Sequence, residues 1–334
     1  MRVSVLGAGV AGLVCALELA ERGAEVEVIE RGERLGAASC SWWAGGMLAP
    51  WCEQEMCGPL LGRAGDGSIQ WWSERVPRTK RNGSLVVAQR LDGVELTQFA
   101  RRTRNFRWAA ADEIAQLEPD LAERFDRALF FPSEAHLEPR AALQAIEARL
   151  GERGVRVRYG ADTPSGSFDR MVDCRGLAAR DLLPGLRGVR GEMLVLRCSE
   201  VTLARPIRLL HPRIPVYVVP RPDHRFMIGA TMIERDDLGG VTARSMLELL
   251  SAACAVHPAF GEAEVIEMGA HVRPAFADNL PRVVRHGNRF FVNGLYRHGF
   301  LAAPALAQVL AEALMTDSDP KEITDEDRMQ RRSA

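Results

Sequence analysis

Several familiar signatures are missing from this chain of 334 residues. It contains no G-x-S-x-G elbow, no P-loop and no H-E-x-x-H pattern. The chain therefore lacks the usual motifs of three common classes of hydrolase. The net charge of −1 gives no reason to expect binding to nucleic acid or to an anionic membrane. The first expected strand starts at Arg2, and we expect no apolar run long enough to span a bilayer. We therefore expect a cytoplasmic protein without a signal peptide or a membrane span.

The seven cysteines form neither a C-x-x-C pair nor a compact framework. An odd number without such spacing is typical of reduced thiols in a cytosol. Cys52 and Cys57 are the closest pair, but no His or Cys partner stands at ligand spacing, so we expect no metal site. An enzyme with these absences would rely on a cofactor for the difficult step, while the protein positions and polarises the substrate.

The first thirty residues carry the strongest local pattern. A short apolar strand leads into Gly7, Gly9 and Gly12 in G-x-G-x-x-G spacing, and a helix and a second apolar strand follow. These glycines permit a tight turn, close approach of a pyrophosphate and close packing of the helix on the sheet. The second strand ends at Glu30, where a carboxylate can accept hydrogen bonds from a ribose 2′-hydroxyl. This acid favours FAD or NAD over NADP, and the stretch alone leaves FAD and NAD open.

Two further segments are typical of backbone that lies against a ligand. Small residues dominate from Gly36 to Gly46, although a plain Gly/Ala loop has the same composition. Later, an expected strand at 168–174 ends at Arg175-Gly176, and doubly wound sheets bind ligands at such strand ends.

The order of the elements predicts two interleaved domains. Strands typical of a nucleotide-binding domain occur at the start, middle and end of the chain, and short strands typical of an antiparallel sheet lie between them. We expect an α/β fold, with an α+β second domain, in which a Rossmann-like FAD/NAD(P)-binding domain (1–80, 136–188 and 268–320) interleaves with an antiparallel-sheet substrate domain (81–135 and 189–267). We further expect a loop and weak helix over 60–72, a closing helix over 304–315 and a flexible tail over 321–334.

Five side chains near expected strand or helix ends are candidates for chemistry. Arg273 and Arg297 stand in apolar surroundings, where a guanidinium needs either a ligand carboxylate or an internal acid. Tyr217 and Met232 fit an ordinary core as well as a pocket wall. His298 could polarise a ligand or could have a purely structural role.

Six segments of the chain, taken together and in this order, resemble the D-amino-acid-oxidase-like family of FAD-dependent amine oxidases, and within it the glycine oxidases of thiamine biosynthesis. The resemblance covers nearly the whole chain. Its segments are GAGVAGLVCALELAERGAEVEVIE, ASCSWWAGGMLAP, LRGVRGEML, YVVPRPDHRFMIGATM, RPAFADNLPRV and GLYRHGFLAAPA. No cysteine follows Cys254, so the covalent flavin link of monomeric sarcosine oxidases is not expected.

The resemblance implies non-covalently bound FAD and a set of contacts to it. Arg273 would hold the substrate carboxylate, and Tyr217, Met232 and Arg297 would line the substrate pocket. The helix that follows Arg297 would stabilise negative charge on the reduced flavin. The implied FAD contacts are Gly7, Gly9, Val10, Ala11, Gly12, Glu30, Arg31, Ser39, Ala44, Gly45, Gly46, Met47, Gly176, Arg297, His298, Gly299, Phe300 and Leu301.

The implied activity is oxidative deamination of glycine, or of another small amino acid or secondary amine, with O2 as acceptor and H2O2 as product. The glycine imine would feed thiazole formation, with enzymes of the thiazole synthase pathway as partners and a homo-oligomer as the assembly. The alternatives are a D-amino-acid or sarcosine-type oxidase, a flavin dehydrogenase with another electron acceptor, an NAD-dependent dehydrogenase and a flavin-binding protein without oxidase activity.

The chain departs from the family pattern at three places. Arg175 replaces a small residue, and Trp42 and Trp43 are bulkier than usual and are expected to tighten the pocket. The stretch GADTPSGSFDRMVDCRG is shorter than its counterpart, so no residue is assigned to the adenine.

Overall fold

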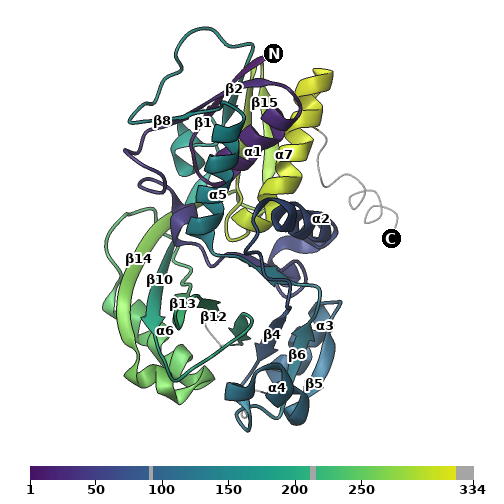
Figure 1. Ribbon diagram of the computed structural model, residues 1–334, viewed down its shortest axis with the longest axis vertical. Coiled ribbons are helices and arrows are strands. Elements are labelled where there is room, and N and C mark those ends of the chain that lie inside the picture. Colours follow the sequence, from purple (N-terminus) through teal and green to yellow (C-terminus); the bar gives the residue numbers. More distant parts are fainter. Residues whose placement is uncertain (90–92, 211–215, 321–334) are drawn as a thin grey trace.

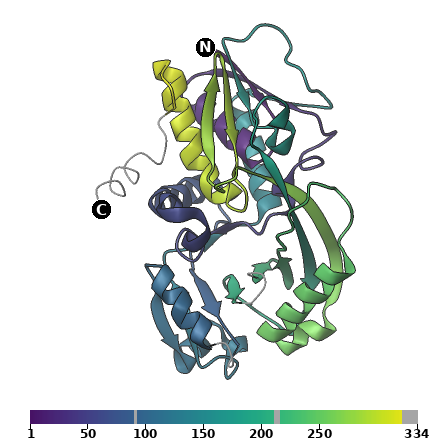
Figure 2. The same cartoon turned by 180° about the vertical axis from the view of Figure 1, so that it is seen from behind.

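The computed structural model describes residues 1–89, 93–210 and 216–320, with the side chains of 55–61, 63 and 64 excepted. Figure 1 shows an elongated molecule with two lobes, and the long strands β10 and β14 run from the upper lobe into the lower one. The view from behind shows the same arrangement, with the N-terminus at the far end of the upper lobe (Figure 2). The predicted tail over 321–334 lies outside the described residues.

The upper lobe is built on a six-stranded sheet. Its order is β15 (Arg282–His286), β16 (Arg289–Asn293), β9 (Arg170–Asp173), β1 (Arg2–Leu6), β2 (Glu25–Glu30) and β8 (Val157–Tyr159). All neighbours are parallel except β15 and β16. The central strand β1 is apolar because a parallel strand is covered on both faces, and Val3 and Val5 are fully buried.

The lower lobe is built on an eight-stranded sheet. Its order is β14 (Glu264–Ala275), β10 (Arg187–Arg197), β13 (Arg225–Gly229), β12 (Val216–Arg221), β11 (Ile207–Leu209), β4 (Ser84–Val87), β6 (Arg127–Phe131) and β5 (Arg107–Ala110). Its neighbours are antiparallel except β11 and β4. A small third sheet pairs β3 (Met47–Leu48) with β7 (Ala135–His136). The expected combination of a mainly parallel sheet with an antiparallel one is confirmed.

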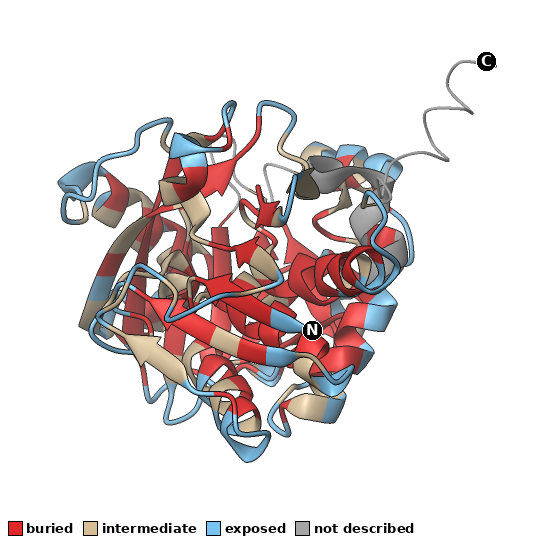
Figure 3. Cartoon of the chain, turned by 90° about the horizontal axis from the view of Figure 1, so that it is seen from above, coloured by how far each residue is buried: buried red, intermediate tan, exposed pale blue. Residues whose placement is uncertain are grey.

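Helices cover both sheets. The α-helices are α1 (Val10–Glu21), α2 (Gln54–Arg75), α3 (Gly93–Arg102), α4 (Ala111–Leu117), α5 (Pro139–Glu152), α6 (Ala243–Val256) and α7 (Gly299–Thr316). The short 3-10 helices are η1 (Cys40–Trp43), η3 (Pro119–Leu121), η4 (Gly176–Asp181) and η5 (Pro258–Glu262). One core lies among β1, α1, α5 and α7, and a second lies between the eight-stranded sheet and α6. Figure 3 shows these buried segments gathered in the middle of the molecule.

The strand β14 belongs to the lower sheet along its whole length. Each end of it pairs with β10, from Glu264 opposite Arg197 to Ala275 opposite Arg187. The domain limit expected at residue 268 therefore falls inside a continuous strand. The division into domains stays a prediction, but the residues from 268 to 275 are paired with the lower sheet.

Two expectations about helices are wrong in extent. The helix α2 is continuous over Gln54–Arg75, where a loop and a weak helix were expected. Its apolar pattern is weak because contacts with neighbouring helices hold it: the buried Trp72 contacts Phe300 of α7, and the buried Trp71 donates to Glu18 of α1. The helix α7 begins at Gly299, before the expected start at Pro304.

A side chain from α2 explains how Pro304 is accommodated inside α7. Proline has no N–H, so it cannot donate to the carbonyl of Phe300 one turn earlier. The indole of Trp72 donates to that carbonyl instead, at 2.7 Å. The hydrogen bond that the helix lacks is thus replaced from a neighbouring helix.

The helix α7 also corrects the expectation that no apolar run could span a bilayer. Among the described residues it is the one helix long and apolar enough to do so, with 18 residues of mean hydropathy 1.4. In the structure 61% of it is buried inside the protein. It packs against α1 and α2 as the central helix of the upper core.

Replacing Trp72 by Phe should destabilise the protein more than replacing Trp71 by Phe. Both rings are buried. The Trp71 indole donates to Glu18 at a distance of 3.3 Å, and Glu18 also accepts two hydrogen bonds from Arg22, so it keeps partners when Trp71 is replaced. Losing the Trp72 donor leaves the Phe300 carbonyl unsatisfied, at a cost of about 1–3 kcal/mol. Denaturant unfolding of both variants measures the difference, and equal losses would contradict the role given to this bond.

Candidate active site

A cavity of about 660 Å³ lies where the two sheets meet. Its walls come from the ends of β1, β2, β9 and β16, from the segment 38–49 and from the inner strands of the lower sheet. All but two of the site residues predicted from the sequence line it. The two exceptions are Gly12 and Met232, which lie behind the wall.

The turn after β1 is held by close backbone packing. Gly7 has a φ of +97°, and a Cβ there would stand 2.7 Å from the carbonyl oxygen of Cys174. A Cβ on Gly12 would stand 1.8 Å from the carbonyl oxygen of Gly7. Only glycine allows α1 to approach the strand this closely, so Gly12 shapes the site from behind the wall.

Glu30 is anchored by the backbone at the edge of the cavity. Its two carboxylate oxygens accept from the N–H groups of Ala8 at 2.7 Å and Gly32 at 2.8 Å. Each oxygen retains a second lone pair that can accept from a ribose hydroxyl.

The segment 161–163 lines the same end of the cavity, beside Glu30 and Arg31. The N–H of Ala161 donates to the carbonyl of Glu30, and Gly160 donates to Gly32. The sequence assigned no residue to the adenine, and this segment could border it. Backbone pairing brings the segment there, so no side-chain motif marks it.

The two tryptophans have separate positions. The Trp43 ring lies over Gly269, where a Cβ would stand 2.1 Å from it, and it lines the cavity. The Trp42 ring lies against Gly36 and does not line the cavity. The expected tightening of the pocket therefore applies to Trp43 alone. Arg140 stacks on both rings, at 4.9 and 5.2 Å from their centroids.

The lining fits FAD on structural grounds. The cavity extends from the anchored Glu30 to the arginines at its other end, as a long dinucleotide requires. Two helix N-termini border it, at Gly9 of α1 and His298 of α7, and neither of these N-cap residues accepts a hydrogen bond with its own side chain. At α1 the hydroxyl of Ser41 accepts from the N–H of Val10, at 3.1 Å. The positive end of a helix dipole suits a pyrophosphate at one position and a flavin carbonyl at the other.

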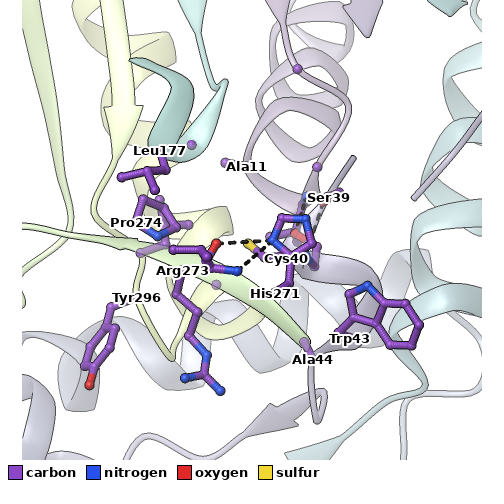
Figure 4. A pocket seen from close by; sticks show the side chains of 18 of the residues that line it. Ala11, Ser39, Cys40, Trp43, Ala44, Leu177, His271, Arg273, Pro274 and Tyr296 are labelled. Carbon is purple, nitrogen blue, oxygen red and sulfur yellow. Dashed lines mark hydrogen bonds between the residues drawn. The ribbon is translucent and has the colours of Figure 1, made fainter. Parts of the chain in front are cut away.

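Arg273 reaches the cavity from β14. It lies opposite Val189 of β10, and its guanidinium crosses Gly191, where a Cβ would stand 2.0 Å from Nη2. It donates to the carbonyl of Thr231 at 3.0 Å, and no acid among the described residues lies within ion-pair distance. Figure 4 shows the side chains of Arg273 and Tyr296 extending to the same side of the strand. Burial and the nearby Arg297 lower the pKa of Arg273 to about 10, so it remains charged at neutral pH.

Arg297 is held by several partners. It donates to the hydroxyl of Tyr217 at 3.2 Å and to the sulfur of Met232 at 3.0 Å. Its guanidinium also lies 3.5 Å from the carboxylate of Glu53. The alternative of an internal salt bridge therefore describes Arg297 but not Arg273. Met232 contacts Arg297 and the hydroxyl of Tyr296 from outside the cavity.

Glu53 is a buried member of the site that sequence reasoning missed. It precedes α2, lines the cavity and lies 3.2 Å from Arg208 and 3.9 Å from the ring of His298. Burial raises the pKa of Glu53, but the charges of Arg297, Arg208 and His298 outweigh it and the net pKa is lowered. Burial lowers the pKa of His298 to about 4, so its imidazole is neutral at pH 7. No local pattern marks Glu53, because its partners come from distant parts of the chain.

Comparisons with known proteins identify a family of FAD-dependent enzymes, in agreement with a cavity that fits FAD. A model of FAD-dependent oxidoreductases, the DAO family, matches residues 2–313. The chain is 54% identical over 324 residues to a Rhizobium etli protein inferred to be the thiamine biosynthesis oxidoreductase ThiO, covering 96% of this chain and 99% of that one. It is 26% identical to a glycine oxidase of Bacillus licheniformis, covering 93% and 92%.

The fold is shared with solved structures of related oxidases. The iminodiacetate oxidase of Chelativorans sp. superposes with a TM-score of 0.80 at 23% identity, covering 97% of this chain and 98% of that one. The family match spans both sheets and the whole cavity, and it settles FAD as the cofactor. The chain therefore belongs to the DAO family of FAD-dependent oxidoreductases.

Proposed function

We propose that this protein is a glycine oxidase. It would convert glycine and O2 to the imine of glyoxylate and H2O2, and water would then release glyoxylate and ammonia from the imine. The observation that carries the proposal is the charged, cavity-lining guanidinium of Arg273, which has no acid partner among the described residues. The names of the Rhizobium and Bacillus relatives support the choice of substrate and the place in thiamine biosynthesis.

The cavity divides into two regions on this proposal. The ADP half of FAD would lie along the turn after β1, between Glu30 and the segment 161–163, without a covalent link. The segment 44–47 and the N-terminus of α7 would border the flavin. When bound, FAD accepts the electron pair from the substrate carbon and passes it to O2.

The chain's own residues would bind and orient the substrate. Arg273 would hold the carboxylate through two hydrogen bonds, which fixes the carbon and the amine in one orientation. Tyr217, kept in place by Arg297, would border the amine end. Met193 and Met227 give this part of the wall an apolar surface that excludes water.

No side chain is required as a base. The amine need only be neutral when its carbon loses hydrogen. Around the substrate end, Arg273, Arg297 and Arg208 bring positive charge and Glu53 is their acidic neighbour. Nearby positive charge disfavours a protonated amine, so the pocket itself promotes the reactive form.

The cellular setting belongs to the same proposal. We expect a cytoplasmic homo-oligomer that delivers the glycine imine to a thiazole-forming enzyme before water reaches it. Peroxide release from glycine, sarcosine and D-alanine tests the substrate and the acceptor together. Glycine should have the highest kcat/KM. Flavin reduction without peroxide formation would favour an electron acceptor other than O2.

Replacing Arg273 by Ala should weaken binding of carboxylate substrates and inhibitors by about 2–4 kcal/mol, because the carboxylate loses its charged partner. FAD content should stay unchanged. Arg273→Lys keeps the charge without the paired donors and should recover part of the affinity. Acetate titrations and the KM for glycine measure both variants, and an unaltered KM in Arg273→Ala would show that the carboxylate binds elsewhere.

Replacing Gly12 by Ala should lower both FAD content and stability, since the added Cβ would meet the Gly7 carbonyl. The control is Gly67→Ala in the exposed part of α2, where a Cβ meets nothing within 4 Å. That change should keep FAD and stabilise the helix by about 1 kcal/mol. Flavin absorbance and melting temperature provide the comparison. Full FAD content in Gly12→Ala would argue against the tight packing at this turn.

A further inference from the structure

The substrate end of the cavity contains two guanidinium groups in different electrostatic states. Arg273 has no acid within ion-pair distance among the described residues, whereas Arg297 lies 3.5 Å from Glu53. A carboxylate entering this end therefore meets one arginine whose charge is available and one whose charge is already balanced. The fold alone does not set the number of carboxylates in the substrate, since the iminodiacetate oxidase shares the fold and is named for a substrate with two carboxylates.

Glu53 is fixed in place from the side away from the cavity. Arg208 lies 3.2 Å from its Oε1 and also donates to the carbonyl of Cys52. The Arg208 guanidinium in turn stacks on the rings of Phe99 and Tyr217, at 4.7 and 5.6 Å from their centroids. The carboxylate thus has a rigid support and cannot turn away from the cavity to make room for another anion.

We propose that Glu53 determines specificity for substrates with a single carboxylate. By balancing Arg297, it leaves Arg273 as the member of this pair of guanidinium groups that can take up a substrate carboxylate. A second carboxylate on the same substrate would approach the buried, negative Glu53 and would find Arg297 already paired. Repulsion of this kind is a common way to reject a competing ligand. The inference rests on the proposed function, because it assigns Arg273 to the substrate.

Ligand binding without turnover tests the proposal. Acetate carries one carboxylate and malonate carries two, and each is titrated into the FAD-loaded protein by flavin absorbance and by calorimetry. The wild-type protein should bind acetate more tightly than malonate. In Glu53→Gln the shape is kept and the charge is lost, so the ratio of malonate to acetate affinity should rise on the order of tenfold. Glu53→Asp keeps the charge and should retain the wild-type ratio.

Turnover gives a second measurement on the same variants. The kcat/KM for iminodiacetate relative to glycine should rise in Glu53→Gln by a similar factor. The matched control is Glu118→Gln. Glu118 is buried, lies 2.8 Å from Arg205 and does not line the cavity, so this variant removes the same charge from another ion pair. That variant should leave both ratios unchanged, which separates a local effect from a change in net charge.

Two results would overturn the proposal. One is a wild-type protein that binds malonate as well as acetate, a measurement that does not depend on how any variant folds. The other is a Glu53→Gln protein with normal FAD content and unchanged ratios. If glycine is not oxidised but the acetate and malonate affinities shift as expected, the proposed function fails while the role of Glu53 stands.

Discussion

The pairing of β14 with β10 is the constraint on which the site depends. The ladder runs the full length of β14, from the far end of the lower sheet to the edge of the upper one. It brings Arg273 into the cavity, and Gly191 on the facing strand leaves the space that the guanidinium occupies. Because antiparallel pairing specifies every side-chain position, a shift of one residue would turn Arg273 to the other face of the sheet.

The upper sheet supplies a different kind of constraint, which is local. The turn after β1 allows no Cβ at Gly7 or Gly12, so α1 begins directly above the strand end. The carboxylate of Glu30 is then held by two backbone N–H groups of neighbouring turns. On the proposed arrangement, a rigid dinucleotide end and a substrate end supported by a long ladder would together fix the distance between FAD and substrate.

Electrostatics distinguishes the two ends of the cavity. Buried guanidinium groups require acceptors, and at the substrate end Glu53 provides one for Arg297 and for Arg208. Arg273 donates to a single carbonyl and keeps its charge for a ligand. The neutral His298 adds no charge at pH 7, so on our proposal the balance among the other groups would decide which anions can enter.

The sequence by itself determined the features that depend on neighbouring residues. The G-x-G-x-x-G turn, the acid at Glu30, most strands and the candidate Arg273 follow from local pattern or from the resemblance of ordered segments. The extent of α2, the early start of α7 and the place of β14 did not, because contacts with other elements override weak local preference there. Only the tertiary structure decided that Glu53 meets Arg297 and that segment 161–163 meets Glu30. Those partners are distant in the chain, and no spacing within the sequence encodes their contact.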